Sequence, residues 1–542
     1  MDEMKPPQSS PAAAEMGDKA KLPGLARRAS SRDLDETYEL YQRQADAQVA
    51  DALDARRVLR KIDWHILPLL MGTYMLQYLD KSSINFAVVF GLKKGTNLQN
   101  QDYAWLSSIF YFGYLFAQYP AGYLLQRLPT AKFIGSTIIG GHADFFPVRL
   151  GGEFPQGIWG VLLITTPACT SFAGIAANRF LLGVFEAVVN PGFVLVMSMW
   201  YQGAEQPLRL VTYYSMNGVA GIFGGLLGYA IGHITSGALP GQWMYIFLIF
   251  GAVSLAWGVV FLLFMPDLPS RARFLAGPEK VIAVERVAAN RQGVKNHHFK
   301  TYQMWQCVRD PKTWILFVMS IAAQIPNASQ SSFQSIILET FGFDALETQY
   351  MQIPGSVFQV VSLLFGGWVS SRWPNMRCAM MFTGNLACVI CGAVLVGLDP
   401  GPDGTQNKWG RLIALWLCSL QSVGFSLSLT MVSSNVAGYT KKQLTGAFVF
   451  VGYCVGNIIG PQTFIEREAP FYTSAYIAVL TGYSIKTIMV AVLYIYMWTV
   501  NKRRDKAAAE RGELSEEEEK QAIELGMQDV TELDNKGFRY SL

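Results

Sequence analysis

Residues 243–266 read WMYIFLIFGAVSLAWGVVFLLFMP, a run of 24 positions without a charged side chain. An α-helix needs about 20 apolar residues to cross the hydrocarbon of a bilayer. A stretch of this length and composition excludes a soluble fold, so the sequence predicts a membrane-spanning helix here. The whole chain agrees, since 51% of its 542 residues are hydrophobic and only 15% are charged.

Charged residues gather in segments 1–62, 271–312 and 501–542 and are sparse in the long stretches between them. Apolar runs in those stretches predict twelve membrane-spanning helices. The expected spans lie near residues 65–88, 103–125, 131–168 (interrupted), 170–192, 209–232, 243–265, 313–338, 349–370, 377–397, 410–432, 444–464 and 473–499. The expected fold is an all-α membrane protein made of two six-helix bundles.

The polar segment 266–312 divides these spans six and six, into bundles over residues 63–265 and 313–500. Lys and Arg concentrate in the loops on one side, which places both termini and the central segment in the cytoplasm. The two tails, residues 1–62 and 501–542, are polar and highly charged. We expect the first to be largely disordered and the second to be disordered or loosely helical.

Two opposite charges stand inside the fourth span, where residues 179–192 read RFLLGVFEAVVNPG. Arg179 and Glu186 are almost two turns apart on one face, about 10 Å from each other, so a direct pair is not expected. A charge at the bilayer centre costs at least about 2.5 kcal/mol, so each must face protein or a water-filled cavity. We assign proton coupling to Glu186, with a static ion pair as the alternative. Asn190 continues this face toward a substrate, and Pro191 is expected to break the helix.

The first span supplies candidate counterparts in LDKSSINFA, residues 79–87. Asp80 and Lys81 point about 100° apart on a helix, so only one of them faces a cavity. We assign anion binding to Lys81, because a lysine in an apolar cavity gains most from a carboxylate ligand. Asp80 joins Glu186 as a candidate for proton coupling. In the alternative interpretation, Lys81 pairs with Glu186 or Asp80 and only fixes the helices.

Polar residues also occur at depth in the second half. In the seventh span Pro326 interrupts the helix beside Gln324 and Asn327. The eleventh span carries Tyr453 and Asn457 among glycines. We expect these four polar side chains to hydrogen-bond to a substrate.

Glycines in GVAGIFGGLLGYAIG, residues 218–232, recur four positions apart. This spacing lets neighbouring helix backbones approach and slide, so Gly225 and Gly228 are assigned to the moving parts of the protein. Arg179 is placed with them as a structural residue. Ordinary packing without motion is the alternative.

Other classes of function find little support. Cys388 and Cys391 are a close pair inside a span with no second pair or histidine nearby, so we expect packing residues and no metal or cofactor. The basic residues follow the loops rather than one patch, which argues against a nucleic-acid partner. No nucleophile–base or metal constellation suggests an enzyme.

Taken together, these segments resemble the major facilitator superfamily, and within it the fungal allantoate permease family of anion:cation symporters. The resemblance covers nearly all of residues 58–500. It is carried by LDKSSINFA at 79–87, SSIFYFGYLFAQYPAGYLLQRLP at 107–129, RFLLGVFEAVVNPGF at 179–193, MPDLPSRARFL at 265–275, DPKTW at 310–314, NVAGYTKK at 435–442 and GYCVGNIIGPQTF at 452–464.

The resemblance implies a symporter that takes up a small organic anion with a proton across the plasma membrane. We expect the protein to be a monomer. Allantoate, ureidosuccinate, a vitamin carboxylate and a short peptide are the candidate substrates. Glu186 matches the family's acidic position linked to proton coupling, and Lys81 matches a basic position in span one. The loop GYLLQRLPTAK, residues 122–132, resembles a degenerate form of the cytoplasmic gating motif. It keeps Gly122 and Arg127 and lacks the usual acidic residue.

One departure from the family lies in span three, where GHADFFPVRLGGEFPQ interrupts the apolar run within residues 140–156. Four ionisable residues and two prolines cannot cross lipid as a helix. We hypothesise a retained intron or gene-model error, because removing about 16 residues leaves a continuous span. Sequencing the transcript tests this, and uniform retention of these codons would refute it.

Two further functions remain open on the same fold. A nutrient sensor would bind its ligand and signal through the tails without net flux, and a metabolite exporter would run in the opposite direction. Accumulation of labelled ligand separates a transporter from a sensor, and the direction of flux separates uptake from export.

Overall fold

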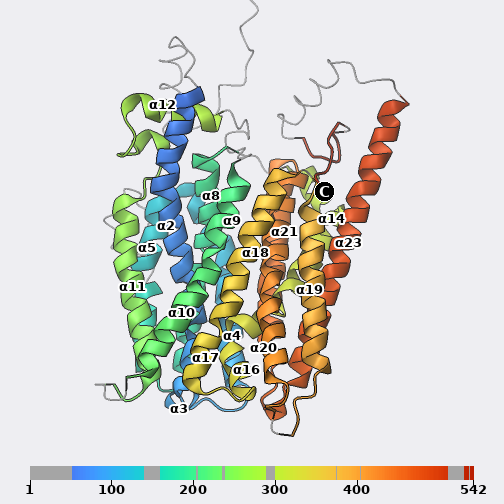
Figure 1. Cartoon of the computed structure of the whole chain (residues 1–542). Coiled ribbons are helices and arrows are strands. Elements are labelled where there is room, and N and C mark those ends of the chain that lie inside the picture. The colour runs from blue at the N-terminus through green and yellow to red at the C-terminus, as the bar shows by residue number, and fades with distance from the viewer. Residues whose placement is uncertain are drawn as a thin grey trace, which may run out of the picture.

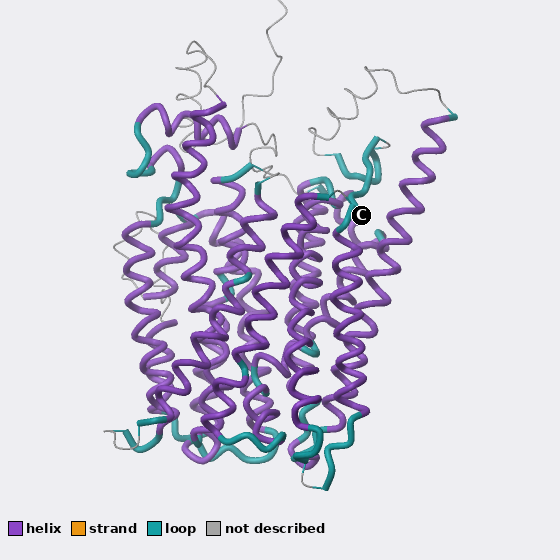
Figure 2. The backbone as a smooth tube through the Cα atoms, viewed as in Figure 1, coloured by secondary structure: helices purple, strands orange, loops and turns teal. Residues whose placement is uncertain are grey.

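The computed structural model describes residues 52–139, 159–202, 205–234, 239–288, 300–373, 375–402, 404–510, 530–535 and 537–542. In this part of the chain the secondary structure is helical, with no strand (Figure 2). The helices form two halves that lie side by side, the first blue to green and the second yellow to red (Figure 1). The predicted all-α architecture is therefore confirmed.

The first half begins with the long helix α2 and ends with α11. Its helices are α2 (Ala52–Ala87), α3 (Leu92–Gly95), α4 (Asp102–Arg127), α5 (Thr130–Ile139), α6 (Trp159–Thr165), α7 (Phe172–Glu186), α8 (Val189–Trp200), α9 (Gln206–Tyr214), α10 (Met216–Gly232) and α11 (Gln242–Phe264). Two helices of the central segment follow, α12 (Gly277–Ala288) and α13 (Thr301–Arg309).

The second half ends with the longest helix of the described chain, α23. Its helices are α14 (Pro311–Gln324), α15 (Asn327–Ser331), α16 (Gln334–Thr340), α17 (Ala345–Met351), α18 (Ile353–Arg372), α19 (Arg377–Gly397), α20 (Lys408–Leu417), α21 (Gln421–Asn435), α22 (Tyr439–Gln462) and α23 (Thr473–Ala509).

The helices of the described residues group into six spans in each half, with two or three consecutive helices forming one span in several places. Among the described residues, eight helical runs are long and apolar enough to cross a membrane. They are residues 172–200, 208–232, 242–264, 345–372, 377–397, 408–435, 440–462 and 473–509. The other four predicted spans correspond to α2, α4, the pair α5–α6 and the run α14–α16.

Prolines break two spans. α14 ends at Gln324 and α15 begins at Asn327, so the break predicted at Pro326 is present. In the fourth span the break comes earlier than predicted, because α7 ends at Glu186 and α8 runs through Pro191. Pro191 has no N–H to donate to the carbonyl four residues before it, so the helix opens on its N-terminal side.

The two ends of the bundle are distinguished by what lies there. We call the end that carries α12 and the C-terminus the termini side, and the end that carries α3, α16 and α17 the far side (Figure 1). Interrupted span three runs between them: α5 and α6 both pack against α11, as two parts of one span. The proposed insertion, residues 140–156, lies outside the described residues.

The tail predictions are wrong at two places. Residues 52–62, assigned to a disordered tail, form the first three turns of α2, where Val58 and Ile62 are buried one turn apart. Residues 530–535 and 537–542 pack against the second half instead of remaining loose. The composition of a segment does not indicate such contacts, because they depend on partners far away in the sequence.

Glycines bring the two halves into close contact. α10 of the first half packs on α17 and α18 of the second. A Cβ atom at Gly225 would lie 2.6 Å from the backbone oxygen of Gln349, and one at Gly228 would lie 2.3 Å from its side-chain oxygen. Both distances are shorter than any real contact. The backbone at Gln349 cannot turn aside, so the halves require glycine at position 225 to meet here, whereas a side chain at position 228 would displace the flexible end of the Gln349 side chain.

Candidate functional site

A cavity of about 60 Å³ lies between the two halves. Since one water molecule needs roughly 10–15 Å³ of such space, the cavity has room for only a few water molecules in this conformation. Six of the residues singled out from the sequence line it: Lys81, Glu186, Asn190, Gln324, Asn327 and Tyr453. The structure thus brings together polar residues from the first, fourth, seventh and eleventh spans.

Lys81 is held against aromatic rings. Its Nζ atom lies 5.2 Å from the centre of the Tyr78 ring and 5.8 Å from that of Tyr111. Such cation–π contacts stabilise an ammonium group in a site with little water. They leave the donors of the ammonium free to bind an anion that enters the cavity.

Glu186 is fully buried at the last residue of α7. Neither of its carboxylate oxygens has a hydrogen-bond partner within the part of the chain that the structure describes. Lys81 therefore does not hydrogen-bond to Glu186, although both line the same cavity. A buried carboxyl without a partner is costly as an anion, which favours a neutral group that binds a proton.

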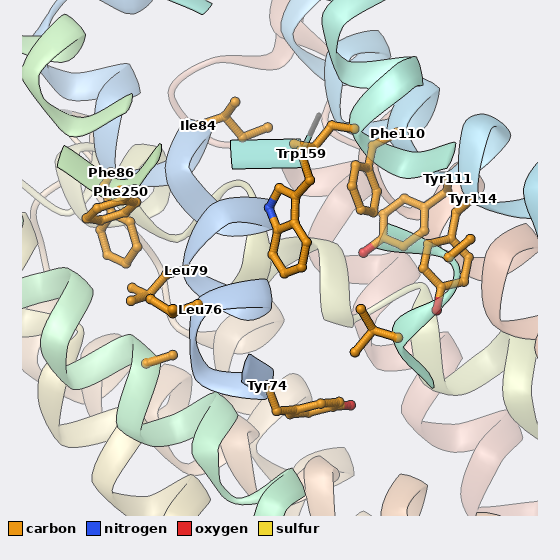
Figure 3. Packing of buried hydrophobic residues seen from close by; sticks show 14 of the residues in the cluster. Tyr74, Leu76, Leu79, Ile84, Phe86, Phe110, Tyr111, Tyr114, Trp159 and Phe250 are labelled. Carbon is orange, nitrogen blue, oxygen red and sulfur yellow. The ribbon is translucent and has the colours of Figure 1, made fainter. Parts of the chain in front are cut away.

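Asp80 points away from the cavity, into the first half. Its Oδ2 atom accepts hydrogen bonds from Trp159 Nε1 at 2.9 Å and from Ser254 Oγ at 2.5 Å. Figure 3 shows Trp159 beside α2, with its indole nitrogen turned toward that helix. Of the two neighbours in span one, only Lys81 faces the cavity, and Asp80 ties α2 to α6 and α11.

Arg179 also lies outside the cavity lining and is almost completely buried. Its guanidinium donates to Ser83 Oγ at 2.9 Å and to the backbone oxygen of Lys81 at 3.4 Å. It also lies 5.5 Å from the centre of the Phe247 ring. These contacts hold the backbone that carries Lys81. Such a role is structural, as the sequence predicted for Arg179.

Asn457 does not line the cavity but holds two residues that do. Its Nδ2 atom donates to Gln324 Oε1 at 3.1 Å, and its Oδ1 atom accepts from Asn327 Nδ2 at 2.9 Å. These bonds connect α22 to both sides of the break at Pro326. In this conformation Asn457 therefore positions Gln324 and Asn327, for which substrate contact was also expected.

Aromatic residues form much of the cavity wall, and sequence reasoning missed them. They include Tyr74, Tyr78, Phe110, Tyr111, Tyr114, Tyr214 and Phe425. Figure 3 shows Phe110, Tyr111 and Tyr114 gathered on one stretch of α4. Tyr74 and Tyr78 stand one turn apart, and Lys81 follows on the same face, so helical spacing from Lys81 was a usable signal.

The predicted gating loop has an unexpected partner. Asp267, just after α11, accepts hydrogen bonds from the backbone N–H groups of Ala131 and Lys132 at 3.0 and 3.2 Å. It therefore caps the start of α5 and supplies a carboxylate where the loop itself lacks one. A Cβ at Gly122 would meet nothing within 4 Å, so packing does not require glycine there. The side chain of Arg127 lies outside what the structure describes.

Polar contacts join the two halves on the far side. Lys93 forms an ion pair with Glu466 at 3.0 Å, and Asn85 donates to Gln352 at 2.8 Å. The Tyr103 hydroxyl donates to the backbone oxygen of Ser332. The far side is thus closed in this conformation.

Comparison with known proteins agrees with this architecture. The family described as the Major Facilitator Superfamily matches residues 70–461. An allantoate permease of Saccharomyces cerevisiae is 33% identical over 519 residues, covering 94% of this chain and 91% of that protein. An uncharacterised transporter of Schizosaccharomyces pombe is 36% identical over 488 residues, covering 89% and 86%. A thiamine pathway transporter of Saccharomyces cerevisiae is 30% identical over 485 residues, covering 89% and 86%.

Proposed function

Because the chain belongs to the Major Facilitator Superfamily, a family of transporters, we propose that it carries a small organic anion together with a proton into the cell. Family membership and the apolar helices make it a multi-pass membrane transporter of small molecules rather than an enzyme. The anion, the proton and the inward direction are the proposal. So are the plasma membrane as its location and the cytoplasm as the compartment on the termini side.

The observation that carries the proposal is the presence of Lys81 and Glu186 on one cavity without a hydrogen bond between them. A static ion pair would use up both charges. Because the two groups do not bond to each other, the ammonium of Lys81 is available to a carboxylate ligand and the carboxyl of Glu186 is available to a proton. Gln324 and Asn327 add neutral hydrogen-bonding groups from the opposite half, which allows a ligand to contact both halves.

This arrangement couples the two ligands through electrostatics. A deprotonated Glu186 and a bound anion would place two negative charges opposite one lysine in a space with little water. Protonation of Glu186 removes one of these charges, so the anion binds more tightly to the protonated protein. By thermodynamic linkage, the anion also raises the affinity for the proton. One proton then accompanies each monovalent anion.

Movement of the halves completes the transport cycle. The cavity is too small for an organic anion, so aromatic rings of its wall must turn aside when one enters. Opening toward the far side requires loss of the Lys93–Glu466 ion pair and of the bond between Asn85 and Gln352. The glycines of α10 lie on the surface along which the halves separate. Alternating access of this kind is general for transporters built from two bundles.

Allantoate is the first substrate to test, since one relative is named an allantoate permease. Ureidosuccinate, vitamin carboxylates and short peptides are the next candidates, because each carries the carboxylate that Lys81 would bind. Competition by this panel against labelled allantoate would rank them.

Uptake into a host strain without its own carriers tests the proposal. We expect labelled anion to accumulate when the outside is acidic and the accumulation to collapse when a protonophore removes the pH gradient. Glu186→Gln should abolish accumulation and retain exchange of labelled for unlabelled anion, whereas the control Glu510→Gln, at an exposed acid near the end of α23, should behave as wild type. Binding without accumulation would instead indicate a sensor, and net efflux an exporter.

A further inference from the structure

The last residues of the chain form a packed element that neither the sequence nor the family assigns a task. This C-terminal segment, residues 530–535 and 537–542, lies on the termini side of the second half (Figure 1). Tyr540 is 2% exposed, and Thr531 and Glu532 are completely buried. A segment of polar composition reaches such burial only where the protein supplies matching partners.

Glu532 is the centre of a buried cluster of charges. Its Oε1 atom accepts from Lys312 Nζ at 2.6 Å and from Lys441 Nζ, and its Oε2 atom accepts from the backbone N–H of Ala437 at 2.9 Å. Asp310 lies 2.7 Å from Lys441 and 3.5 Å from Lys312. Two lysines are thus matched by two carboxylates, and one of these comes from the C-terminal segment.

The balance of charge in the buried cluster depends on the carboxylate of Glu532. Lys312, Lys441 and Asp310 are each at most 2% exposed, and they belong to the second half itself. With the segment docked and the carboxylate of Glu532 neutralised, two buried ammonium groups would share a single carboxylate. An uncompensated buried charge is strongly unfavourable, so the second half is built to receive one more carboxylate at this place.

Amide side chains bind the backbone at the end of the segment. Asn435 donates to the carbonyl of Ser541 at 2.9 Å and accepts from its N–H at 2.8 Å. Asn501 does the same with Tyr540, at 2.8 and 2.9 Å. Each side-chain amide therefore hydrogen-bonds to both the backbone N–H and the backbone C=O of one residue, as the backbone of a neighbouring strand would.

Further contacts orient the segment. The guanidinium of Arg504 donates to the carbonyls of Phe538 and Glu532 at 2.6 and 2.7 Å. The Tyr540 ring covers Lys312, whose Nζ lies 4.2 Å from the ring centre. The groups that hold the segment come from the start of α14, the end of α21, the start of α22 and the end of α23. These four helix ends belong to the second half. Gln306 of α13, in the central segment, also accepts a hydrogen bond from the Thr531 hydroxyl at 2.7 Å, and Asn375 accepts one from the N–H of Leu542 at 3.1 Å.

We propose that this face of the second half is a binding site for a peptide that presents one carboxylate side chain, that its occupant is the chain's own C-terminal segment, and that Glu532 is the residue the site recognises. Docking ties the ends of α14, α21, α22 and α23 together on the termini side. The site is separate from the central cavity, so the proposal stands independently of the transported substrate.

Hydrogen–deuterium exchange of the purified full-length protein tests docking without any mutation. The N–H groups of Tyr540 and Ser541 should exchange slowly, because side chains of the second half bind them. Exchange at the rate of an unstructured peptide would overturn the proposal.

Variants then test recognition. Glu532→Gln should raise exchange at Tyr540 and Ser541 at least about tenfold. Asp534→Asn is the matched control, because Asp534 is an exposed acid of the same segment whose side chain accepts from Gln306. It should leave exchange unchanged. Equal exchange in Glu532→Gln and Asp534→Asn would contradict a specific role for Glu532.

A labelled synthetic peptide of residues 530–542 provides an independent measurement. It should bind full-length Glu532→Gln protein at least about tenfold more tightly than wild type, in which the site is occupied. A peptide with glutamine in place of the glutamate should lose this binding. Equal binding of both peptides, or of neither, would overturn the assignment.

Discussion

Gly225→Ala tests whether the contact between α10 and α17 controls the closed far side. The added Cβ would lie 2.6 Å from the backbone oxygen of Gln349, whereas ordinary contacts begin at 3.4 Å, so the helices must part by roughly 0.8 Å. Backbone cannot turn aside as a side chain can. Overpacking of this kind costs about 1–3 kcal/mol.

That cost is relieved when the halves separate, so it acts against the closed state alone. A change of about 1–3 kcal/mol shifts the ratio of closed to open protein by roughly 5- to 150-fold. Crosslinking of an Asn85→Cys, Gln352→Cys pair by a short bifunctional thiol reagent reports this ratio, because the native side chains hydrogen-bond across the far side at 2.8 Å. We expect Gly225→Ala to slow the crosslinking.

The control is Gly446→Ala, since a Cβ there would meet nothing within 4 Å. The single-cysteine variants show whether any of the native thiols contributes to the crosslink. If Gly225→Ala and Gly446→Ala crosslink at the same rate as the parent, close packing of α10 does not control closure and the reasoning is refuted.

Three further predictions concern the charged groups. Lys81→Ala should weaken the binding of anionic ligands at least about tenfold and leave the binding of neutral analogues nearly unchanged. Competition binding measures both affinities, and an equal loss for the two kinds of ligand would contradict the role of Lys81. Asp80→Asn should lower the thermal stability by several degrees while proton-dependent uptake persists in the folded fraction, because Asp80 faces Trp159 and not the cavity. Burial acts to raise the pKa of Glu532, but the two neighbouring lysines outweigh it and hold the pKa below its usual value of 4.5. The stabilisation of the docked C-terminal segment should therefore be complete above pH 4.5 and fall as the pH drops through that lower pKa, which intrinsic-rate-corrected exchange measurements would detect.

Sequence reasoning located the spans because membrane helices obey a local rule, a run of about 20 apolar residues. The same rule missed the start of α2 and the docked C-terminal segment. There the apolar content is low, and order depends on distant partners such as Lys312 and Lys441 for Glu532. No pattern in the neighbouring sequence indicates a contact with such distant partners.

The candidate site was predicted in part for a related reason. Lys81 and Glu186 stand out as charges in apolar surroundings, so their position on the cavity followed from the cost of placing charge in lipid. Which way Asp80 turns depends on Trp159 and Ser254, residues of two other helices. Most of the aromatic wall was missed because only Tyr74 and Tyr78 share a helix with Lys81. The other rings come from α4, α9 and α21, and only the tertiary packing brings them to the cavity.

Proton uptake on ligand binding tests the central claim most directly. In weakly buffered solution with a pH indicator, saturating the purified protein with its anion should remove close to one proton per protein from the solvent at a pH where Glu186 is ionised in the free protein. Glu186→Gln should bind the anion and take up none. Equal proton uptake by wild type and Glu186→Gln would contradict the coupling of anion and proton at this cavity.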